Sequence, residues 1–350
     1  MKLIEGDRIW GIERNSGVRH CAFGDLTLYR GVLLAVFREA DGHVSDVARI
    51  RVLFQNQRGR WMSLGTIGVS DRDLRDPHFW HLADGTLCIT AAVVDRSRNT
   101  AQSATYAWPL HQLTLGEISG YGTGSLLPDR DLSVTPHVLT DHNCWLWRVL
   151  GTSSENFGFC YGNGELYFCR SSFTNPFAMA SSANVEFDNE KVNEAALCLS
   201  SSGSLIALLR CDPDRWRSNT EEFDEVELSD QDAGHSALSY FGVSQAPYSH
   251  WAWQPFPQRV GGPSIIPASD GGYWAAFRAY RDPHCWEPQW VEVVKLGENG
   301  ETEQALRLPS GGSDCGYPGL VEQDGELLCL YYSNHESDHG ASIYLARIAV

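Results

Sequence analysis

One pattern recurs along the chain and constrains the fold more than any other feature. A short apolar run is followed by a turn of glycine or polar residues and then by a second β-rich run. It appears as LTLYRGVLLAVFR, FWHLADGTLCITAA, VLTDHNCWLWR, LCLSSSGSLIALLR, IIPASDGGYWAAFR and LVEQDGELLCLYY. Such pairs of runs around a turn are typical of β-hairpins, and strong helical periodicity is absent. The sequence therefore predicts an all-β protein.

The spacing of the hairpins predicts how they are arranged. Their turns lie near residues 31, 85, 142, 203, 271 and 325, at intervals of roughly 54 to 68 residues. Six units of this length suit six four-stranded antiparallel blades of a β-propeller. We expect residues 1–350 to form one such domain, with the closing segment 341–350 as an outer strand that locks the ring. The acidic segment 212–235 is expected to be a surface insert of blade four.

Charge and composition exclude several classes of partner. The formal net charge is -17, which argues against nucleic acid and against anionic membrane surfaces. The N-terminal segment has acids where a secretory signal needs an apolar stretch. The ten cysteines include no CxxC pair, and many lie inside apolar runs. This pattern suits buried thiols in a reducing cytoplasm better than a disulfide framework or a zinc site. The sequence leaves the oligomeric state open.

Several arginines share one position in the hairpin repeat. Arg38, Arg210 and Arg278 each stand seven residues after a turn glycine, and Arg148 lies at the equivalent strand end of the third unit. In blades two and six, the same offset gives Ala92 and Tyr332. Equal offsets in equivalent hairpins place side chains at one level of the ring. Each arginine could pair with an acid of the next blade. As a group, they predict a basic pocket for a small anionic ligand.

A tyrosine stands on an unusually bare segment near the C-terminus. The stretch LPSGGSDCGYPGLV, residues 308–321, surrounds Tyr317 with glycine, proline and small side chains. One interpretation is a turn whose tyrosine merely covers a neighbouring strand. The other is a phenol presented for chemistry. A phenol is a poor nucleophile unless a base takes its proton or cations stabilise the phenolate.

Short motifs support the second interpretation through a resemblance. They are FREADGH (37–43), LRDP (74–77), NEAAL (193–197), GGPSII (261–266), SGGSDCGYPGL (310–320) and YYSNHE (331–336). In this order and spacing, the chain resembles the sialidase-like propeller superfamily of BNR-type proteins from about Arg19 to Val350. The resemblance implies a six-bladed propeller that needs no cofactor or metal ion.

The resemblance also implies roles for particular residues. Sialidases use an arginine triad for the substrate carboxylate, a tyrosine nucleophile assisted by a glutamate, and an aspartic acid/base. By motif, Tyr317 resembles the nucleophile, Glu194 the assisting glutamate, and Arg210 and Arg278 two of the triad arginines. A tyrosine is preferable to a carboxylate where the anomeric carbon carries a negative group, because a charged nucleophile would be repelled.

Two parts of the sialidase pattern are missing. His20 or Cys21 stands where the first triad arginine is expected. The acid/base aspartate has no clear counterpart, which leaves Asp41, His43 and Asp76 as candidates. The fold therefore carries over better than the sialidase activity does. A relative that accepts another acidic or polar glycoside fits the sequence better.

Further candidates come from the starts and ends of the predicted blades. Asp76 is either a pocket acid or a brace at the start of blade two. HESDH, residues 335–339, matches the HExxH zinc motif, but that motif needs a helix and this segment lies between two strand patterns. We expect no metal there. The residues expected to contact substrate are Arg38, Arg75, Arg148, Arg210, Arg278, His20, His137, His335 and Glu336.

Two functions remain open at this point. The first is a sialidase-like glycoside hydrolase with a tyrosine and glutamate centre in an arginine-lined pocket. The alternative is a non-catalytic propeller that binds a carboxylated sugar or a small anionic metabolite, because a fold does not fix a function. In both cases the expected ligand is a small carbohydrate or anionic molecule. A hydrolase requires Tyr317 or a water molecule within reach of a base.

Overall fold

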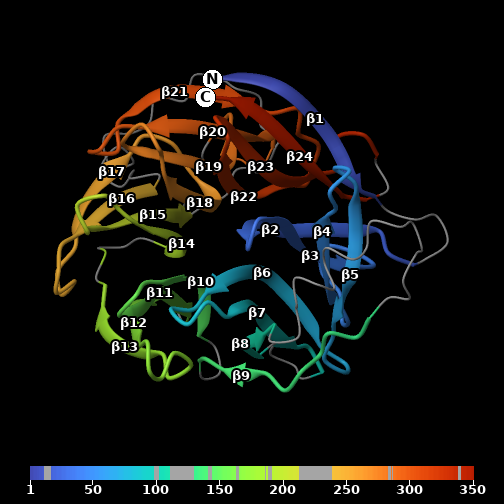
Figure 1. The fold of residues 1–350 in the computed structure, drawn as a ribbon, viewed down its shortest axis with the longest axis horizontal. Helices are drawn as coiled ribbons and strands as arrows, with labels where there is room; N and C mark the ends of the chain where they lie inside the picture. Colours follow the sequence, from blue (N-terminus) through green and yellow to red (C-terminus); the bar gives the residue numbers. More distant parts are fainter. Residues whose placement is uncertain are drawn as a thin grey trace.

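In the computed structural model, the described residues are 1–11, 17–97, 102–110, 130–140, 144–162, 165–185, 187, 191–212, 239–282, 285, 287–337 and 340–350. Their strands form six antiparallel sheets of four strands each. The sheets surround a common axis, with β2, β6, β10, β14, β18 and β22 nearest the centre (Figure 1). The predicted six-bladed propeller is confirmed. Within these ranges there is no helix that could cross a membrane.

The first three blades follow the chain in order. Blade one contains β2 (His20–Tyr29), β3 (Val32–Ala40), β4 (Arg49–Gln55) and β5 (Trp61–Ile67). Blade two contains β6 (Asp73–His81), β7 (Leu87–Asp95), β8 (Gln102–Pro109) and β9 (His137–Val138). Blade three contains β10 (Trp145–Gly151), β11 (Glu155–Gly162), β12 (Glu165–Ser172) and β13 (Ala180–Asn184).

The last three blades complete the ring. Blade four contains β14 (Lys191–Leu199), β15 (Leu205–Asp212), β16 (Ser239–Ser244) and β17 (Ala252–Phe256). Blade five contains β18 (Gly261–Pro267), β19 (Tyr273–Tyr280), β20 (Gln289–Leu296) and β21 (Thr302–Arg307). Blade six contains β22 (Cys315–Gln323), β23 (Glu326–Ser333), β24 (Ser342–Ala349) and β1 (Lys2–Trp10).

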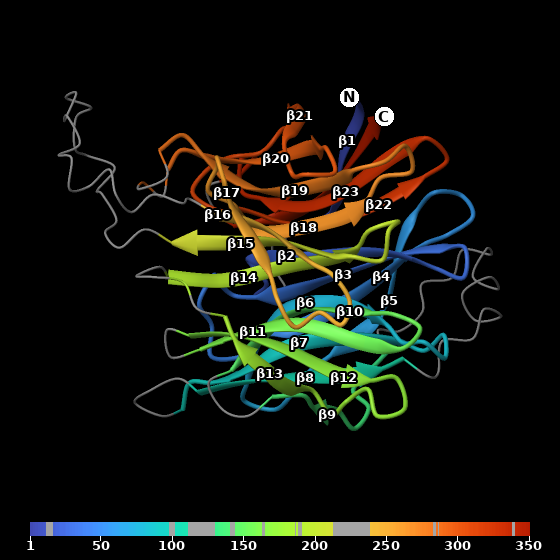
Figure 2. The same ribbon diagram turned by 90° about the vertical axis from the view of Figure 1, so that its left-hand side faces the viewer.

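Blade six shows how the ring closes, and it corrects one expectation. The closing segment forms β24, which is the third strand of its blade, and the outermost strand is β1. The two strands pair antiparallel from Lys2 opposite Ala349 to Trp10 opposite Ile343. The two chain ends therefore lie side by side at the edge of the ring (Figures 1 and 2). The N-terminal strand β1 locks the ring, because it pairs with the edge of β24 that the other strands of blade six leave open.

Strand alternation builds the core between neighbouring blades. On β3, Leu34 and Val36 pack with residues of blade two, such as Leu74. Ala35 and Phe37, which alternate with them, face the opposite way and pack with residues of blade six, such as Leu330. Successive side chains of a strand point to opposite faces of its sheet. The continuous apolar runs of the sequence thus reflect strands that are buried on both faces.

Each innermost strand carries an irregularity near its beginning. The register shifts lie between Ala22/Asp25, Arg75/His78, Leu146/Val149, Val192/Ala195, Gly261/Ser264 and Gly316/Gly319. Four residues inside these bulges have left-handed backbones, namely Phe23 (φ 56), Asp76 (φ 51), Gly262 (φ 55) and Tyr317 (φ 48). A non-glycine residue in this region costs about 1–2 kcal/mol. Bulges re-aim side chains and are frequent beside active sites.

The cysteines and the acidic segment need separate comment. Eight cysteines are buried free thiols, but Cys144 and Cys160 form a disulfide, so the expectation of thiols is wrong for these two. They meet because β10 pairs with β11, which brings their Cα atoms within 5.7 Å. Most of the predicted acidic insert, residues 213–235, lies outside the described residues. Its first residue, Asp212, ends β15.

Candidate active site

Tyr317 lies at the bulge of β22 with its hydroxyl directed at Glu194, in the bulge of β14. The hydroxyl donates a hydrogen bond to Glu194 Oε1 at 2.6 Å, and the residue is 8% exposed. Burial, followed by the negative charge of Glu194, raises the pKa of Tyr317 well above its ordinary value of 10. The phenol therefore keeps its proton at neutral pH. It can lose that proton only to a positioned acceptor, and Glu194 has the required position.

Two further groups hold Glu194 in place. Its Oε2 accepts a hydrogen bond from the backbone N–H of Gly262 at 2.7 Å and forms an ion pair with Arg210 Nη1 at 2.7 Å. Gly262 has a left-handed backbone, and a Cβ there would lie 2.6 Å from the Tyr317 ring. Only glycine permits this approach. The GGP motif thus positions both Glu194 and the tyrosine ring.

Arg210 connects the tyrosine to a second acid. Its Nη1 donates to the Tyr317 hydroxyl at 3.3 Å, and its Nη2 lies 2.9 Å from Asp212 Oδ1. Asp212 also receives Arg259 Nη2 at 2.5 Å. Burial alone would raise the pKa of Asp212, but the two arginines outweigh it and the pKa is lowered. The charge of Arg210 is therefore balanced by internal carboxylates.

Arg278 lies on the other side of the tyrosine ring. Its Cζ is 5.0 Å from the centroid of the Tyr317 ring. Its Nε donates to the carbonyl of Cys315 at 2.5 Å, and its Nη2 donates to the Tyr332 hydroxyl at 2.8 Å. The same Nη2 lies 3.9 Å from Asp314 Oδ1. Both arginines predicted to belong to the triad thus contact Tyr317, and both also face acids of the chain itself.

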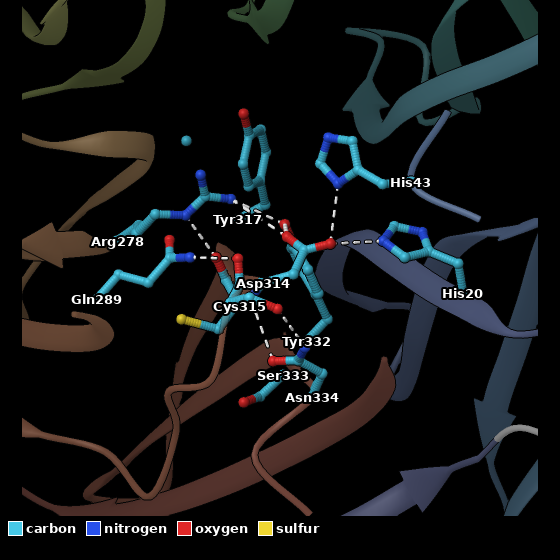
Figure 3. Close-up of polar contacts among 12 residues, drawn as sticks. His20, His43, Arg278, Gln289, Asp314, Cys315, Tyr317, Tyr332, Ser333 and Asn334 are labelled. Atoms are coloured by element: carbon cyan, nitrogen blue, oxygen red, sulfur yellow. Dashed lines mark hydrogen bonds and ion pairs between the residues drawn. The ribbon is translucent and has the colours of Figure 1, made fainter. Parts of the chain in front are cut away.

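Asp314 is the acid at the centre of a second cluster, shown in Figure 3. Its Oδ2 accepts hydrogen bonds from His20 Nε2 at 2.7 Å and His43 Nδ1 at 2.8 Å. Its Oδ1 accepts from the Tyr332 hydroxyl at 2.7 Å. Burial would raise the pKa of Asp314, but the bonds from His20 and His43 outweigh it and lower the pKa strongly. The carboxylate is therefore ionised.

His20, His43 and Asp314 also have the residue types of a metal site. Their potential ligand atoms all lie within 4.8 Å of one another. However, Arg38 Nη1 lies 3.2 Å from His20 Nδ1, and a guanidinium can only donate. His20 must therefore carry its proton on Nε2, the atom that faces Asp314. A metal-ligating histidine instead donates its second ring N–H outward. The cluster fits a hydrogen-bonded carboxylate better than a metal ion.

Arg38 lies beside this cluster and is fully buried. Its Nε donates to Asp73 Oδ1 at 2.9 Å, and its Nη1 donates to the carbonyl of Gly42 at 2.9 Å. Asp73 also pairs with Arg96 at 3.2 Å. Arg38 therefore orients His20, with its own charge balanced by Asp73.

Arg75 and Asp76 are the contribution of blade two. Asp76 is buried inside the bulge of β6, and its Oδ1 has no hydrogen-bond partner among the described residues. Burial raises the pKa of Asp76 to about 7, with the negative charge of Glu194 adding to the shift and Arg75 opposing it. Arg75 Nε likewise has no hydrogen-bond partner in the described ranges. An unbonded carboxylate oxygen and a raised pKa are the features that a pocket acid requires.

Phe23 links the two sides of the site. Its ring lies 5.0 Å from the Tyr317 ring and 5.3 Å from the His43 ring. The guanidinium of Arg75 lies over the same ring at 4.9 Å. Exposure increases away from Tyr317, since the His43 side chain is 44% exposed. The site therefore opens to solvent on the side of His43.

The remaining predicted residues lie elsewhere. Arg148 donates to Asp25 at 2.9 Å and to the carbonyl of Pro318 at 2.8 Å, so it braces the tyrosine segment. Asp41 is exposed on the segment after β3. Three residues lie on outer strands and loops: His137 stacks on Phe177, His335 contacts Ser333 and Tyr344, and Glu336 pairs with Arg8. The structure does not bring Asp41, His137, His335 or Glu336 to Tyr317.

Sequence reasoning missed several residues that complete the site. They are Phe23, Asp73, Asp212, Arg259, Gly262, Asp314 and Tyr332, together with Trp147, whose ring lies 5.3 Å from the Tyr317 ring. Tyr332 shares the hairpin offset of Arg38, Arg210 and Arg278, which was a usable signal. A second signal is proline directly after a bulge residue, as at Asp76, Gly262 and Tyr317.

Comparisons with known proteins agree with this architecture. No protein-family model matches the sequence, and no curated protein matches it. A solved structure of a protein of unknown function from Dyadobacter fermentans is similar over 100% of this chain and 99% of its own, with a TM-score of 0.72 and 16% identity. The GH93 α-L-arabinofuranosidase of Fusarium graminearum is similar over 100% and 98%, with a TM-score of 0.64 and 9% identity.

A sialidase is among the similar structures. The Trypanosoma rangeli sialidase matches 98% of this chain with a TM-score of 0.61 and 11% identity, and the match spans 59% of the sialidase chain. At these identities the likeness shows the fold. The six-bladed propeller fold predicted from the motifs is therefore confirmed, and the solved structures similar to it include glycoside hydrolases and a sialidase.

Proposed function

We propose that this protein is a glycoside hydrolase with Tyr317 as nucleophile, Glu194 as the base that receives the phenol proton, and Asp76 as general acid. The hydrogen bond of 2.6 Å between the Tyr317 hydroxyl and Glu194 carries the proposal. The tyrosine is held there by a left-handed backbone, a strained conformation that needs a reason. Presentation of the phenol to a substrate is such a reason.

The proposed reaction has two balanced steps. In the first, the Tyr317 oxygen bonds to the anomeric carbon and its proton passes to Glu194. The glycosidic C–O bond breaks, and Asp76 gives its proton to the leaving oxygen. In the second, water attacks the anomeric carbon, Asp76 takes a proton from that water, and Tyr317 leaves and recovers its proton from Glu194. The net change is hydrolysis with retained configuration.

The surroundings of each group support its proposed role. Arg210 beside the Tyr317 hydroxyl and Arg278 over its ring stabilise the negative charge that develops on the phenol oxygen. The raised pKa of Asp76, about 7, keeps it protonated in mildly acidic and near-neutral solution. Asp41 is exposed, and His43 already donates to Asp314, so Asp76 is the better donor.

A covalent trap tests the proposal directly. The protein is screened with 4-methylumbelliferyl glycosides of α-L-arabinofuranose, neutral hexoses, uronic acids and N-acetylneuraminic acid. The 2-fluoro or 3-fluoro analogue of an accepted sugar should then form a stable adduct. Trypsin cleaves after Arg307 and Arg347, so the adduct should appear on peptide 308–347. Fragmentation should assign it to Tyr317 and not to Tyr331, Tyr332 or Tyr344.

The matched control is Tyr317→Phe, which keeps the ring. It should form no adduct and should not turn over the accepted glycoside. If the variant retains normal turnover, Tyr317 is not the nucleophile. If every glycoside binds without turnover, the protein is instead a propeller that binds a sugar or small metabolite.

A further inference from the structure

The donors around Asp314 together form an anion-binding site. His20, His43 and Tyr332 each donate a hydrogen bond to this one carboxylate, and Arg278 lies 3.9 Å away. Figure 3 shows that these side chains come from blades one, five and six and converge on it. The Asp314 side chain is only 14% exposed. A small carboxylate from solution would find the same donors if Asp314 did not already fill the site.

The other predicted anion ligands are also occupied from within. Arg38 pairs with Asp73 at 2.8 Å, and Arg210 pairs with Glu194 at 2.7 Å. A carboxylate clamp requires guanidinium groups that are free to bind the ligand, and these two already bind acids of the chain. The expectation of an arginine pocket that grips an external anion is therefore weakened by the chain's own acids.

Electrostatics make a second carboxylate here unfavourable. A ligand carboxylate placed near Arg278 and His43 would lie beside the ionised Asp314. Two such charges about 4 Å apart repel by roughly 4 kcal/mol at an effective dielectric constant of 20. One of the two would have to take up a proton or move away. The site therefore selects against a substrate with a carboxylate at this position.

The groups left for substrate suit hydroxyls. Arg75 Nε and Asp76 Oδ1 have no hydrogen-bond partner among the described residues, and they belong to adjacent positions of β6. One offers a donor and the other an acceptor or, when protonated, a donor as well. Sugar hydroxyls both donate and accept, so this pair can bind a neutral sugar without an added charge.

We propose that Asp314 is a built-in substitute for a substrate carboxylate, so that the site accepts glycosides of aldoses, whose anomeric carbon carries no carboxylate, and rejects ulosonic acid glycosides. The inference rests on the proposed hydrolase function for its substrate class. A tyrosine would still be preferable to a carboxylate as nucleophile, because the negative charge of Asp314 would repel a charged nucleophile as a substrate carboxylate would.

Removal of the Asp314 carboxylate tests the substitution without any need for turnover. Asp314→Ala opens a vacancy lined by Arg278, His20, His43 and Tyr332. Acetate should bind there and raise Tm as its concentration increases, with sodium chloride as the control for ionic strength. Asp314→Asn is the matched control, because it removes the charge but fills the space. We expect acetate to bind Asp314→Ala at least about fivefold more tightly than Asp314→Asn or the unmodified protein.

Three outcomes would overturn the proposal. The first is an acetate effect of equal size on the unmodified protein and on Asp314→Ala. The second is a folded Asp314→Ala variant, by circular dichroism, with no response to acetate. The third is binding of N-acetylneuraminic acid to the unmodified protein by saturation-transfer NMR that Asp314→Asn strengthens no more than Glu336→Ala does. This last measurement also decides the matter if Asp314→Ala does not fold.

Hydrolysis measurements with two classes of aryl glycoside distinguish this proposal from the hydrolase proposal. The unmodified protein should hydrolyse at least one aryl aldoside and should not hydrolyse the aryl ketoside of N-acetylneuraminic acid. Hydrolysis of the ketoside would overturn the role of Asp314 while supporting hydrolase activity. Acetate binding to Asp314→Ala without any hydrolysis would support the role of Asp314 as an internal anion and count against the hydrolase.

Discussion

Two tyrosine–carboxylate pairs lie side by side in this propeller, and their likeness is close. Tyr317 donates to Glu194 at 2.6 Å, and Tyr332 donates to Asp314 at 2.7 Å. Burial followed by a neighbouring acid raises the pKa of both phenols well above 10. Arg278 contacts both tyrosines, since it lies over the Tyr317 ring and donates a hydrogen bond to the Tyr332 hydroxyl. By hydrogen bonding alone, the two pairs could not be told apart.

The backbone and the surroundings of the carboxylates distinguish them. Tyr317 stands in a bulge with φ 48, whereas Tyr332 lies in the regular part of β23 with partners on both sides. Tyr332 is 0% exposed and Tyr317 is 8% exposed. Among the residues that the structure describes, Glu194 has one other side-chain partner, Arg210, while Asp314 also binds two histidines. The proposed reaction therefore uses the pair that combines backbone strain with some exposure to solvent.

The largest expected effect comes from removing one oxygen from the strained pair. Tyr317→Phe should lower kcat by about two or more orders of magnitude, because the nucleophile is lost. The ring contacts with Phe23 and Trp147 remain, but Glu194 Oε1 loses its phenol donor, at a cost of about 1–3 kcal/mol of folding free energy. Steady-state kinetics and a thermal melt check this together. Retention of most of the turnover would remove the proposed difference between the two tyrosines.

The next effect concerns the carboxylate of the same pair. Glu194→Gln can still accept a hydrogen bond from Tyr317 but cannot take its proton. We expect kcat to fall roughly a hundredfold. Its amide would also face the Gly262 N–H and Arg210, so Tm should fall more than in Tyr317→Phe. A variant with normal kcat would mean that the phenol proton goes to another group.

A smaller and pH-dependent effect is expected for Asp76. Because its pKa is raised to about 7, the acid form predominates below that pH. In the unmodified protein, kcat/KM should therefore fall as pH rises through about 7. Asp76→Asn should lose activity mainly on the acid side and abolish this limb of the profile. An unchanged limb in Asp76→Asn would assign the titration to another residue, with His43→Ala as the next variant to measure.

The same raised pKa makes a prediction about stability. The folded-state pKa of about 7 lies above the ordinary carboxyl value of 3.8, so the folded protein holds the Asp76 proton more tightly than the unfolded chain does. This contribution to stability is present below about pH 4 and is lost as pH rises to about 7. Asp76→Asn should therefore gain in Tm relative to the unmodified protein between pH 4 and pH 8. A constant difference would contradict the shift.

The smallest effect on activity is expected for the unstrained pair. Tyr332→Phe leaves Asp314 Oδ1 without its phenol donor, at a cost of about 1–3 kcal/mol of folding free energy. It leaves Tyr317 and Glu194 in place, so kcat should stay within about threefold. The two phenylalanine variants should thus lose similar amounts of Tm and differ in kcat. A large loss of kcat would make both tyrosines parts of the catalytic group.

The sequence predicted the propeller well because hairpins are local. Turn glycines such as Gly31 and Gly203 determine where strands reverse, and the spacing between turns determines the number of blades. The motifs also identified Tyr317, Glu194, Arg210 and Arg278, which the structure brings together. The hydrogen-bond partners of these four residues could not be predicted from the motifs. Asp314 and Asp212 meet their partners only because the ring closes and the bulges redirect side chains. Local sequence patterns do not predict either of these features.

Bulges also explain the misplaced candidates. His137, His335 and Glu336 were assigned because they lie near the starts and ends of predicted blades. That rule holds for second strands such as β15 and β19, which carry Arg210 and Arg278. It fails for β9, an outermost strand, and for the segment between β23 and β24. The direction of a side chain at the ring centre depends on the register shift of the innermost strand, which adds a residue without a sequence signature beyond the following proline.

The pairing of β1 with β24 has a consequence for how this protein is made. Residues 2–10 are synthesised long before their partner strand at residues 342–349. Until that partner has been made, the nascent chain carries an unpaired strand and an incomplete sixth blade. Such exposed edges favour association with other chains. A chaperone that shields residues 2–10 until β24 has been made would protect the step on which the whole ring depends.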